Sequence, residues 1–373
     1  MFFSASLTRA SLAKALGRIS RIVEKRNTIP ILANVLIEAD ADGLLLRATD
    51  LDMEAVERVL ATVYAPGALT VPAHLLFDIA RKLPDGANIS MTAEEGHSPL
   101  LIRSGRSRFS LNALPSVDFP ELSKGEYTHS FQLKAGDFAK LLNNSSFAMS
   151  NEDTRYYLNG VYLHTITEGN ALNVRAVATD GHRLARVDNL APERADGMPG
   201  VILPRKAVVE LAKLLDGADT VRASISQTKA RFEVGPVILT TKLIDGSFPD
   251  YQRVIPAGND KRLVVDKEPF LASVDRILTL SSERGKAVKL ALSTNRLEIS
   301  IINSDSGSAI EELDVEYDSS IFEVGFNGRY LTDVVSQIEG EVVVFKFADP
   351  GSPALIADRE ESGALFVLMP LRV

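Results

Sequence analysis

The chain of 373 residues contains no cysteine, which excludes disulfides, thiolate metal sites and cysteine nucleophiles. No apolar run approaches the ~18–20 residues that a membrane helix needs, so we expect no membrane partner. The sequence has no glycine-rich phosphate loop, no Gly-x-Ser-x-Gly elbow and no His-Glu-x-x-His pair. Its five histidines are scattered without the spacing of metal ligands. These absences favour a binding protein that uses no metal and no cofactor over an enzyme.

Positive charge is also in short supply. There are 41 Lys and Arg against 49 Asp and Glu, a net charge of −8, whereas most nucleic-acid binders are basic. Residues 1–26 are the exception, because they are basic and nearly free of acids. That composition resembles a transit peptide. We instead predict a folded helix, because a strand-like run at 29–37 follows at once. Without a signal sequence or cysteines, the chain suits the reducing cytoplasm.

The predicted first helix covers residues 6–25. At 100° per residue, one face is apolar, with Leu12, Leu16, Ile19 and Val23. The opposite face is basic, with Lys14, Arg18, Arg21 and Lys25. A solvated surface face is the plain alternative, but such faces normally mix both signs of charge. A stripe of one sign on an acidic protein indicates contact with a polyanion.

The chain repeats itself. Ala178-Thr179-Asp180 ends an apolar, β-branched run, and Ala48-Thr49-Asp50 copies it with matching flanks. A third, fainter copy follows. Repeats of roughly 125 residues are the size of whole domains. We expect domains at 1–126, 127–257 and 258–373. Each has the order helix, strands, helix, strands, with short turn-linked strands such as the one predicted at 156–164. The fold class is therefore α+β with antiparallel sheets.

One pair of residues carries a hint of catalysis. Asp180 and His182, two residues apart beside a strand end, are the only suggestive pair of an acid and a histidine. A hydrolase using this pair is the enzymatic alternative, but no nucleophile accompanies it. We expect Asp180 to cap the turn and His182 to line a surface groove.

Several motifs together resemble the bacterial β sliding clamp, the processivity subunit of DNA polymerase III. They lie at 28–32, 71–73, 103–111, 155–160, 178–185, 248–251 and 369–370, and they span all three repeats. The resemblance implies three clamp domains, each with two helices packed on antiparallel sheet. It further implies a head-to-tail homodimer that forms a ring around double-stranded DNA, with helices lining the hole.

The resemblance also assigns residues. For DNA binding it implies Arg26, Tyr156 and Tyr157 beside the basic helix. His74 and Glu152 stand at DNA-facing positions but depart from the family pattern, and Glu152 would repel phosphate. The implied dimer interface joins Arg106, Arg108, Phe109 and Leu111 of one copy to the region of Leu280 and Glu311 of the other. The implied peptide-binding pocket contains Leu158, Thr179, Gly181, His182, Arg183, Leu184, Pro249, Arg253, Val254, Val367, Met369, Pro370, Leu371 and Arg372.

The implied partners are the catalytic subunit of DNA polymerase III, the clamp loader, and other polymerases and repair proteins that carry clamp-binding peptide motifs. Such a protein is a non-catalytic processivity factor, and ATP hydrolysis belongs to the loader. Besides the hydrolase, a monomeric peptide-binding adaptor with no role on DNA is the other alternative.

Overall fold

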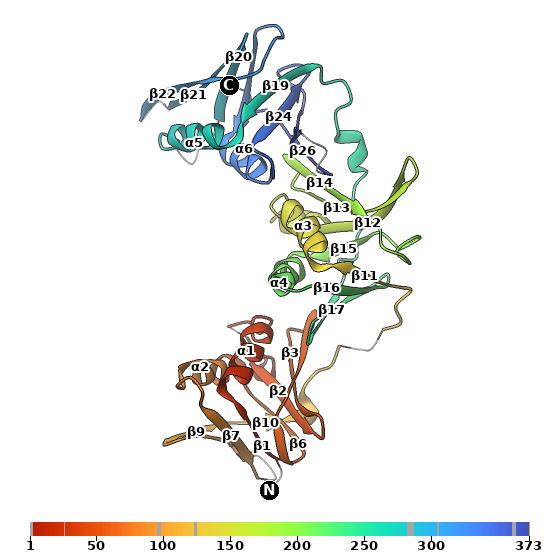
Figure 1. The fold of residues 1–373 in the computed structure, drawn as a ribbon, viewed down its shortest axis with the longest axis vertical. Coiled ribbons are helices and arrows are strands. Elements are labelled where there is room, and N and C mark those ends of the chain that lie inside the picture. The colour runs from red at the N-terminus through yellow and green to blue at the C-terminus, as the bar shows by residue number, and fades with distance from the viewer. Residues whose placement is uncertain are drawn as a thin grey trace. The chain divides into compact units, whose positions relative to one another are not determined.

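A computed structural model describes residues 3–25, 27–94, 98–122, 125–281, 287–303, 306–359 and 363–372. The chain divides into two compact units (Figure 1). Unit 1 comprises Met1–Ala139, Pro192–Pro199 and Lys206–Leu243, and unit 2 comprises Lys140–Ala191, Gly200–Arg205 and Ile244–Val373.

Repeat one begins with a strand, a helix and a short helical turn: β1 (Phe3–Thr8), α1 (Arg9–Ile19) and η1 (Pro30–Ala33). Five strands follow: β2 (Asn34–Asp40), β3 (Gly43–Thr49), β4 (Met53–Val59), β5 (Thr62–Ala65) and β6 (Gly67–Pro72). The second helix and the remaining elements are α2 (Ala73–Lys82), β7 (Asn88–Ala93), β8 (Leu100–Ser104), β9 (Ser107–Leu111), β10 (Leu114–Pro115) and η2 (Ser116–Asp118).

Repeat two has the same order. Its first half is β11 (His129–Lys134), α3 (Ala135–Ser146), η3 (Asp153–Leu158), β12 (Gly160–Glu168), β13 (Ala171–Thr179) and β14 (Arg183–Leu190). Its second half is β15 (Val201–Pro204), α4 (Arg205–Leu215), β16 (Thr220–Ile225), β17 (Lys229–Val234), β18 (Val237–Lys242) and η4 (Tyr251–Val254).

Repeat three closes the described chain. It consists of β19 (Lys261–Asp266), α5 (Lys267–Leu278), β20 (Ala287–Ser293), β21 (Arg296–Asn303), β22 (Gly307–Asp314), β23 (Phe322–Asn327), α6 (Gly328–Val335), β24 (Val342–Phe347), β25 (Ala354–Asp358) and β26 (Ala364–Leu368). The predicted α+β class, with three similar modules of two helices and antiparallel strands, is confirmed.

Strand pairing within each unit crosses the repeat boundary. In unit 1 a sheet in the order β5-β1-β7-β8-β9 accompanies a nine-stranded sheet in the order β10-β6-β2-β3-β4-β18-β17-β16-β11. In unit 2 an eight-stranded sheet in the order β15-β12-β13-β14-β26-β25-β24-β19 accompanies a sheet in the order β22-β21-β20-β23. Repeat one is thus joined to repeat two by β4 and β18, and repeat two to repeat three by β14 and β26.

Helices cover these sheets. In Figure 1, α1 packs beside α2, and α5 packs beside α6. The apolar face predicted for the first helix is buried at Leu12, Leu16 and Ile19, and Val23 is buried beyond its end. In unit 2, the Phe270 ring of α5 lies 5.4 Å from that of Phe345 in β24. The helices therefore bury the sheet faces that would otherwise meet water.

Three predicted segments were wrong in extent. The strand-like run expected at 29–37 forms a strand only from Asn34, because Pro30–Ala33 is the 3₁₀ helix η1. The helix expected at 6–25 covers only Arg9–Ile19, because residues 3–8 pair with β7 as a strand. Thr8 caps it by accepting a hydrogen bond from the Ser11 N–H at 3.2 Å. The strand expected at 156–164 begins only at Gly160, because the preceding residues form the 3₁₀ helix η3.

The repeated Thr-Asp turns match atom by atom. Asp50 Oδ1 accepts the N–H groups of Asp52 and Met53 at 3.0 and 2.7 Å. Asp180 Oδ1 accepts those of His182 and Arg183 at 2.9 and 3.0 Å. Leu51 and Gly181 occupy the same turn position with positive φ, at 78° and 88°. The two turns are therefore structural equivalents, and they fix the alignment of repeats one and two.

Candidate functional site

An apolar cluster lies in unit 2, where β14 meets β26. It consists of buried Val177, Leu184, Tyr251 and Val367, with Leu184 paired to Val367 across the two strands. Partly buried Tyr162, Phe248, Ile255 and Leu355 pack against it. The rings of Tyr162 and Phe248 stack with centroids 4.9 Å apart. The cluster gives this face of the sheet an apolar site of the kind that receives side chains of a short peptide.

The turn at 179–183 forms one edge of this site. Asp180 Oδ2 accepts a hydrogen bond from Arg183 Nε at 3.1 Å, while its Oδ1 caps the turn as predicted. The His182 ring lies 6.2 Å from that of Tyr330, centroid to centroid. The Asp180 carboxylate therefore shapes the turn and holds Arg183.

A small cavity adjoins the turn. It measures about 140 Å³ and is lined by His182, Asn327, Tyr330, Met369, Pro370 and Leu371. Met369 N–H donates to His182 O, and Leu371 N–H to Gly325 O, both at 2.8 Å. These backbone bonds hold the C-terminal segment while its side chains stay accessible. Met369 and Leu371 are 39% and 40% exposed.

Arg183 supports the wall behind the cavity. Its guanidinium lies 4.3 Å from the centre of the Tyr330 ring and 5.2 Å from that of Phe147. It also pairs with Asp333 at 2.5 Å. Stacking of this kind orders a side chain by contact as well as by charge, so Arg183 positions Tyr330.

A polar network lies beneath the apolar cluster. Arg175 is 1% exposed and donates to both oxygens of Asp188, at 2.6 and 2.7 Å, and to Tyr251 Oη at 3.2 Å. Tyr251 Oη lies 3.0 Å from His164 Nε2, and His164 Nδ1 lies 3.0 Å from Thr165 O. Because the carbonyl can only accept, His164 donates from Nδ1, and in the neutral ring Nε2 then accepts the Tyr251 proton. This arrangement requires neutral His164.

We expect this network to make stability depend on pH. Burial lowers the pKa of His164, and the Arg175 charge lowers it further. Below about pH 6.5, His164 is therefore protonated in the unfolded chain but stays neutral in the folded chain until a lower pH. Stability is full above that pH and falls as the pH drops, by at most about 1.4 kcal/mol per pH unit. Urea unfolding of wild type and His164→Gln, which keeps an acceptor, should diverge below pH 6.5; parallel curves would contradict this.

The structure brings most of the predicted pocket residues together. Thr179, Gly181, His182, Arg183, Leu184, Val367, Met369, Pro370 and Leu371 lie on the turn, on the paired strands or on the C-terminal segment beside them. Pro249, Arg253 and Val254 belong to the connection that carries Tyr251, with Arg253 paired to Asp250 at 2.8 Å. Leu158 is buried and accepts the Ser150 N–H at 2.9 Å, and Arg372 is exposed.

Of the four buried residues of the cluster, the sequence predicted Leu184 and Val367 for the pocket but missed Val177 and Tyr251. Val177 looks like an ordinary strand residue, and Tyr162 and Tyr330 stand outside any pocket motif. Tyr251 closes the Phe-Pro-Asp-Tyr motif, so a signal for it existed. The pairing of β14 with β26, which no local pattern reveals, is what places these residues around one site.

The equivalent seam between repeats one and two is polar. Aligning the two turns places Arg47, Glu54 and Thr240 where Val177, Leu184 and Val367 stand. Arg47 lies 3.6 Å from Glu54, which also accepts the Leu122 N–H at 3.3 Å. Burial raises the pKa of Glu54, against the opposing effect of Arg47. The second seam is therefore apolar at the positions where the first is charged or polar.

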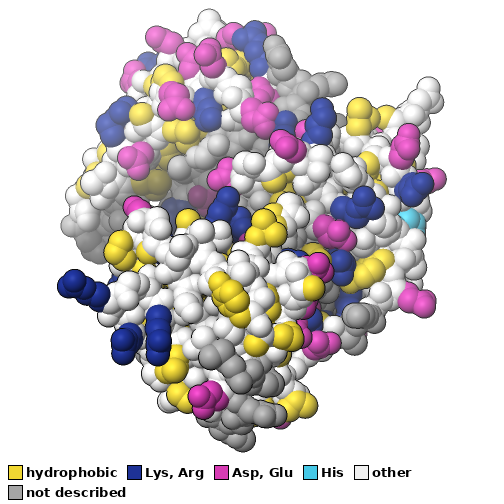
Figure 2. All heavy atoms as spheres, turned by 60° about the horizontal axis from the view of Figure 1, so that its bottom comes forward, with side chains coloured by type: hydrophobic (Ala, Val, Ile, Leu, Met, Phe, Trp, Pro, Cys, Tyr) yellow, Lys and Arg dark blue, Asp and Glu magenta, His cyan; other side chains and the backbone are white. Residues whose placement is uncertain are grey.

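A shallow basic hollow lies in unit 1. It measures about 410 Å³, and Lys14, Arg18, Arg21 and His74 line it together with Phe77 and neighbouring small residues. The basic residues predicted to share a helix face thus largely gather, although Arg21 and Lys25 lie beyond the end of α1. Arg18 donates from Nε to Glu57 Oε2 at 2.9 Å. On the face drawn in Figure 2, basic and acidic side chains are interspersed over most of the surface.

The remaining predicted DNA-binding residues lie in two places. Arg26 falls outside the described residues, and exposed Lys25 precedes it. In unit 2, Glu152 is paired with Arg155 at 2.7 Å, so its charge is compensated. Tyr156 is 53% exposed, and its ring meets that of Tyr157 edge to face at 5.8 Å.

The predicted dimer residues lie on two sheet edges. Strand β9 is the last strand of its sheet and carries exposed Arg108 and buried Leu111, with exposed Arg106 in the preceding turn. Phe109 is half-buried. Strand β22 is an edge in unit 2 and carries Glu311. A hydrogen bond from Arg276 lowers the pKa of Glu311 to about 2. Leu280 follows α5 and accepts the Asn303 amide at 2.8 Å.

Within the described part of the chain, no group of three or more His, Asp or Glu side chains could hold a metal ion. In the same residues, no helix is long and apolar enough to cross a membrane.

The fold and site define a protein of three repeated clamp-type modules with an apolar cluster at the seam of β14 and β26. Its sequence matches the family models of the DNA polymerase III beta subunit: the N-terminal domain at residues 1–123, the central domain at 132–250 and the C-terminal domain at 252–372. The chain therefore belongs to the DNA polymerase III beta subunit family, the bacterial beta sliding clamps, and functions as a sliding clamp in DNA replication.

Similar proteins agree with this over the full length. The beta sliding clamp of Caulobacter vibrioides is 48% identical over 369 residues, and that of Escherichia coli K12 is 42% identical over 371 residues; each match covers 99% of both chains. A crystal structure of the DnaN sliding clamp of Bartonella birtlesii bound to griselimycin is 49% identical, with a TM-score of 0.97 and 100% of both chains covered. The resemblance inferred from the motifs is confirmed.

Proposed function

We propose that two copies of this chain close head to tail into a ring around duplex DNA, and that partner proteins dock on the ring through short peptides at the apolar cluster. The three repeats, at 1–126, 127–257 and 258–373, are the domains of this ring. Catalysis of DNA synthesis belongs to the partners, and the clamp works in the cytoplasm.

The internal seams carry the argument for a ring. The first joins β4 to β18, and the second joins β14 to β26. In each repeat one strand is the third after the first helix (β4, β14 and β22) and another is the third after the second helix (β9, β18 and β26), and the two seams use strands of these kinds. The same rule leaves two strands unused within one chain: β22 of repeat three and β9 of repeat one. Pairing β22 with β9 of a second copy completes the series, and two such seams close a dimer.

The chemistry of those two edges supports their pairing. An exposed strand edge is a template for another strand. β9 and the turn before it offer Arg106 and Arg108, whereas β22 carries Glu311, Glu312 and Asp314, of which Glu311 and Glu312 also pair with Arg276 and Arg296 of the same chain. Opposite charges attract across a seam, and the basic edge repels a second basic edge. A head-to-tail contact therefore suits these strands better than β9 against β9.

Encirclement also resolves the charge of the chain. An open DNA binder depends on many phosphate contacts and weakens steeply with salt. A ring holds DNA topologically, so the basic hollow with Lys14, Arg21 and His74, together with Arg26, Tyr156 and Tyr157, can guide the duplex without gripping it. A net charge of −8 is compatible with that role.

The apolar cluster supports docking of short motifs from the polymerase III catalytic subunit, the clamp loader, and other polymerases and repair proteins. Mostly apolar walls with a few polar edges are typical of peptide recognition. By analogy with the Bartonella birtlesii clamp, we expect griselimycin to bind this chain.

Retention on DNA tests encirclement. We expect protein loaded by a clamp loader to stay on nicked circular DNA in high salt and to run off linear DNA through its free ends. The readout is protein that co-elutes with DNA on gel filtration, and blocking both ends of the linear DNA should restore retention. Equal loss from circles and linear DNA would reject the ring.

The same preparation separates the alternatives. Light scattering at micromolar concentration should give the mass of two chains, whereas the monomeric adaptor predicts one. His182→Ala should weaken peptide binding, whereas loss of a hydrolytic turnover would favour the hydrolase.

A further inference from the structure

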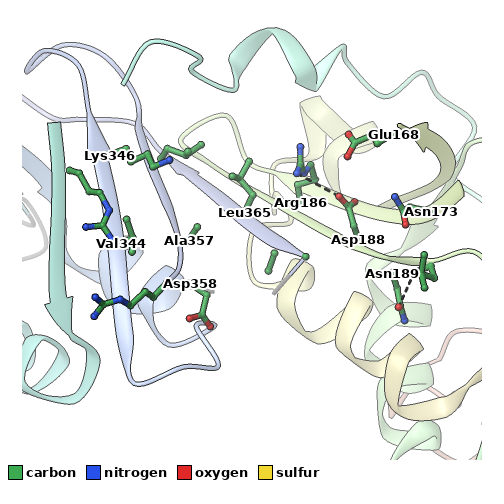
Figure 3. Close-up of a pocket in the computed structure, with 16 residues that line it drawn as sticks. Glu168, Asn173, Arg186, Asp188, Asn189, Val344, Lys346, Ala357, Asp358 and Leu365 are labelled. Atoms are coloured by element: carbon green, nitrogen blue, oxygen red, sulfur yellow. Dashed lines mark hydrogen bonds and ion pairs between the residues drawn. The ribbon is translucent and has the colours of Figure 1, made fainter. Parts of the chain in front are cut away.

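A second hollow lies on the face of the eight-stranded sheet that carries the apolar cluster. It is a groove of about 860 Å³, and Figure 3 shows side chains from both repeats of unit 2 around it. The pairing registers place it. One row across the strands runs Leu184, Val367, Leu355, Lys346, Arg262. The next row on the same face runs Arg186, Leu365, Ala357, Val344.

The groove continues the apolar cluster. Leu184 and Val367 of the first row belong to the cluster, and Leu355 both packs against them and lines the groove. Because Ala357 has a small side chain, the second row forms a depression between Leu365 and Val344. A chain whose apolar residues fill the cluster can therefore run on into the groove without leaving the sheet.

The carboxylates around the groove already have donors. Asp188 accepts two hydrogen bonds from buried Arg175, Glu168 accepts one at 2.6 Å, and Asp358 accepts the Gly340 N–H at 2.8 Å. Asp188 is largely buried, and the exposed Glu168 is paired with Arg175, so these donors offset much of the negative charge beside the groove.

The cationic side chains around the groove have fewer and longer contacts with carboxylates. Among the described residues, the buried Nε of Arg186 has no hydrogen-bond partner, and its nearest carboxylate, Asp188, lies 3.6 Å from Nη2. Lys346 is exposed beside Arg262, whose contact with Glu316 is long at 4.0 Å. The groove therefore offers positive charge next to an apolar anchor site, on a chain that is acidic as a whole.

We propose that this groove receives an acidic, extended segment of the same partner chain whose apolar residues occupy the cluster. The segment adjoins the anchor in the partner's sequence, and its carboxylates pair with Lys346, Arg262 and Arg186. The inference rests on the proposed peptide-docking function and adds to it a preference for acidic flanking residues.

Labelled synthetic peptides test the preference with the full-length clamp. Each contains the apolar pair Leu-Phe joined to a short alternating glycine–aspartate segment, placed before the pair in one peptide and after it in another. Matched peptides carry asparagine for aspartate. By fluorescence anisotropy we expect the aspartate peptide to bind about tenfold tighter than its match in one of the two orders, and high salt to reduce the difference.

Variants locate the effect. Lys346→Glu with Arg262→Glu should abolish the preference for aspartate and leave the asparagine peptides unchanged. Lys134→Glu, an exposed reversal on β11, which does not line the groove, should keep the preference. Equal affinities of aspartate and asparagine peptides in both orders overturn the groove proposal. If no peptide binds, or if binding survives Met369→Asp at the small cavity that adjoins the 179–183 turn beside the cluster, the docking function itself fails.

Discussion

Reversing the charges of one sheet edge should dissociate the dimer, and mixing two opposite reversals should restore it. The first variant carries Arg106→Glu and Arg108→Glu, and the second carries Glu311→Lys and Glu312→Lys. In a head-to-tail dimer of either variant, both seams bring like charges together. Like-charge contacts across an interface cost several kcal/mol, so we expect Kd to rise at least about 100-fold. Sedimentation at micromolar concentration should show monomers.

The equimolar mixture distinguishes the geometries. In a head-to-tail heterodimer one seam joins an acidic β9 to a basic β22, and the other seam is wild type. Both are complementary, so the dimer and its retention on circular DNA should return. In a dimer that pairs β9 with β9, the second variant alone would keep its interface. A dimeric second variant, or a mixture that stays monomeric, therefore contradicts the head-to-tail ring. Lys82→Glu with Lys134→Glu, which changes the same number of exposed charges away from the two edges, should stay dimeric.

The repeat architecture could be predicted because each turn depends on a few neighbouring residues that can be recognised in the sequence. The Thr-Asp turns need a short side chain that accepts two N–H groups and a following residue with positive φ, and both copies keep that pattern. Helix ends were harder to predict. The 3.6-residue pattern of apolar and basic residues runs past Ile19, but the chain turns at Ser20, whose N–H donates to Leu16 O. The periodic pattern correctly predicted that Val23 is buried. It did not predict the helix end, because a turn after Ile19 buries Val23 without continuing the helix.

The site could be predicted only in part, because strand pairing between distant segments creates it. Leu184 and Val367 are ordinary β residues in the sequence, and only the register of β14 with β26 makes them neighbours. Their counterparts Glu54 and Thr240 show that the same seam geometry is compatible with a polar site. Resemblance to the family supplied the pocket residues, whereas the polar first seam, the Arg175 network and the groove became visible only in three dimensions.

Met369→Asp should abolish peptide docking while leaving the ring intact. A substitution at buried Leu184 or Val367 would not separate loss of peptide docking from loss of folding. Removing a buried aliphatic side chain costs about 2–5 kcal/mol of stability. Met369 is 39% exposed and lines the small cavity beside His182, so its replacement leaves the core packed. A carboxylate there loses its hydration when an apolar peptide side chain arrives. We expect peptide affinity to fall by about 100-fold or more, equivalent to roughly 3 kcal/mol.

Two further measurements decide whether that loss belongs to the pocket. Ile321→Asp, on a residue that is 82% exposed in unit 2 and does not line the cavity, should bind peptide like wild type. Met369→Asp should remain dimeric by sedimentation and unfold at the same urea concentration as wild type, yet fail to make the polymerase processive on primed circular DNA. If it supports wild-type processivity, partners do not depend on this site. If it loses the dimer as well, the pocket and the ring are not separable by this residue.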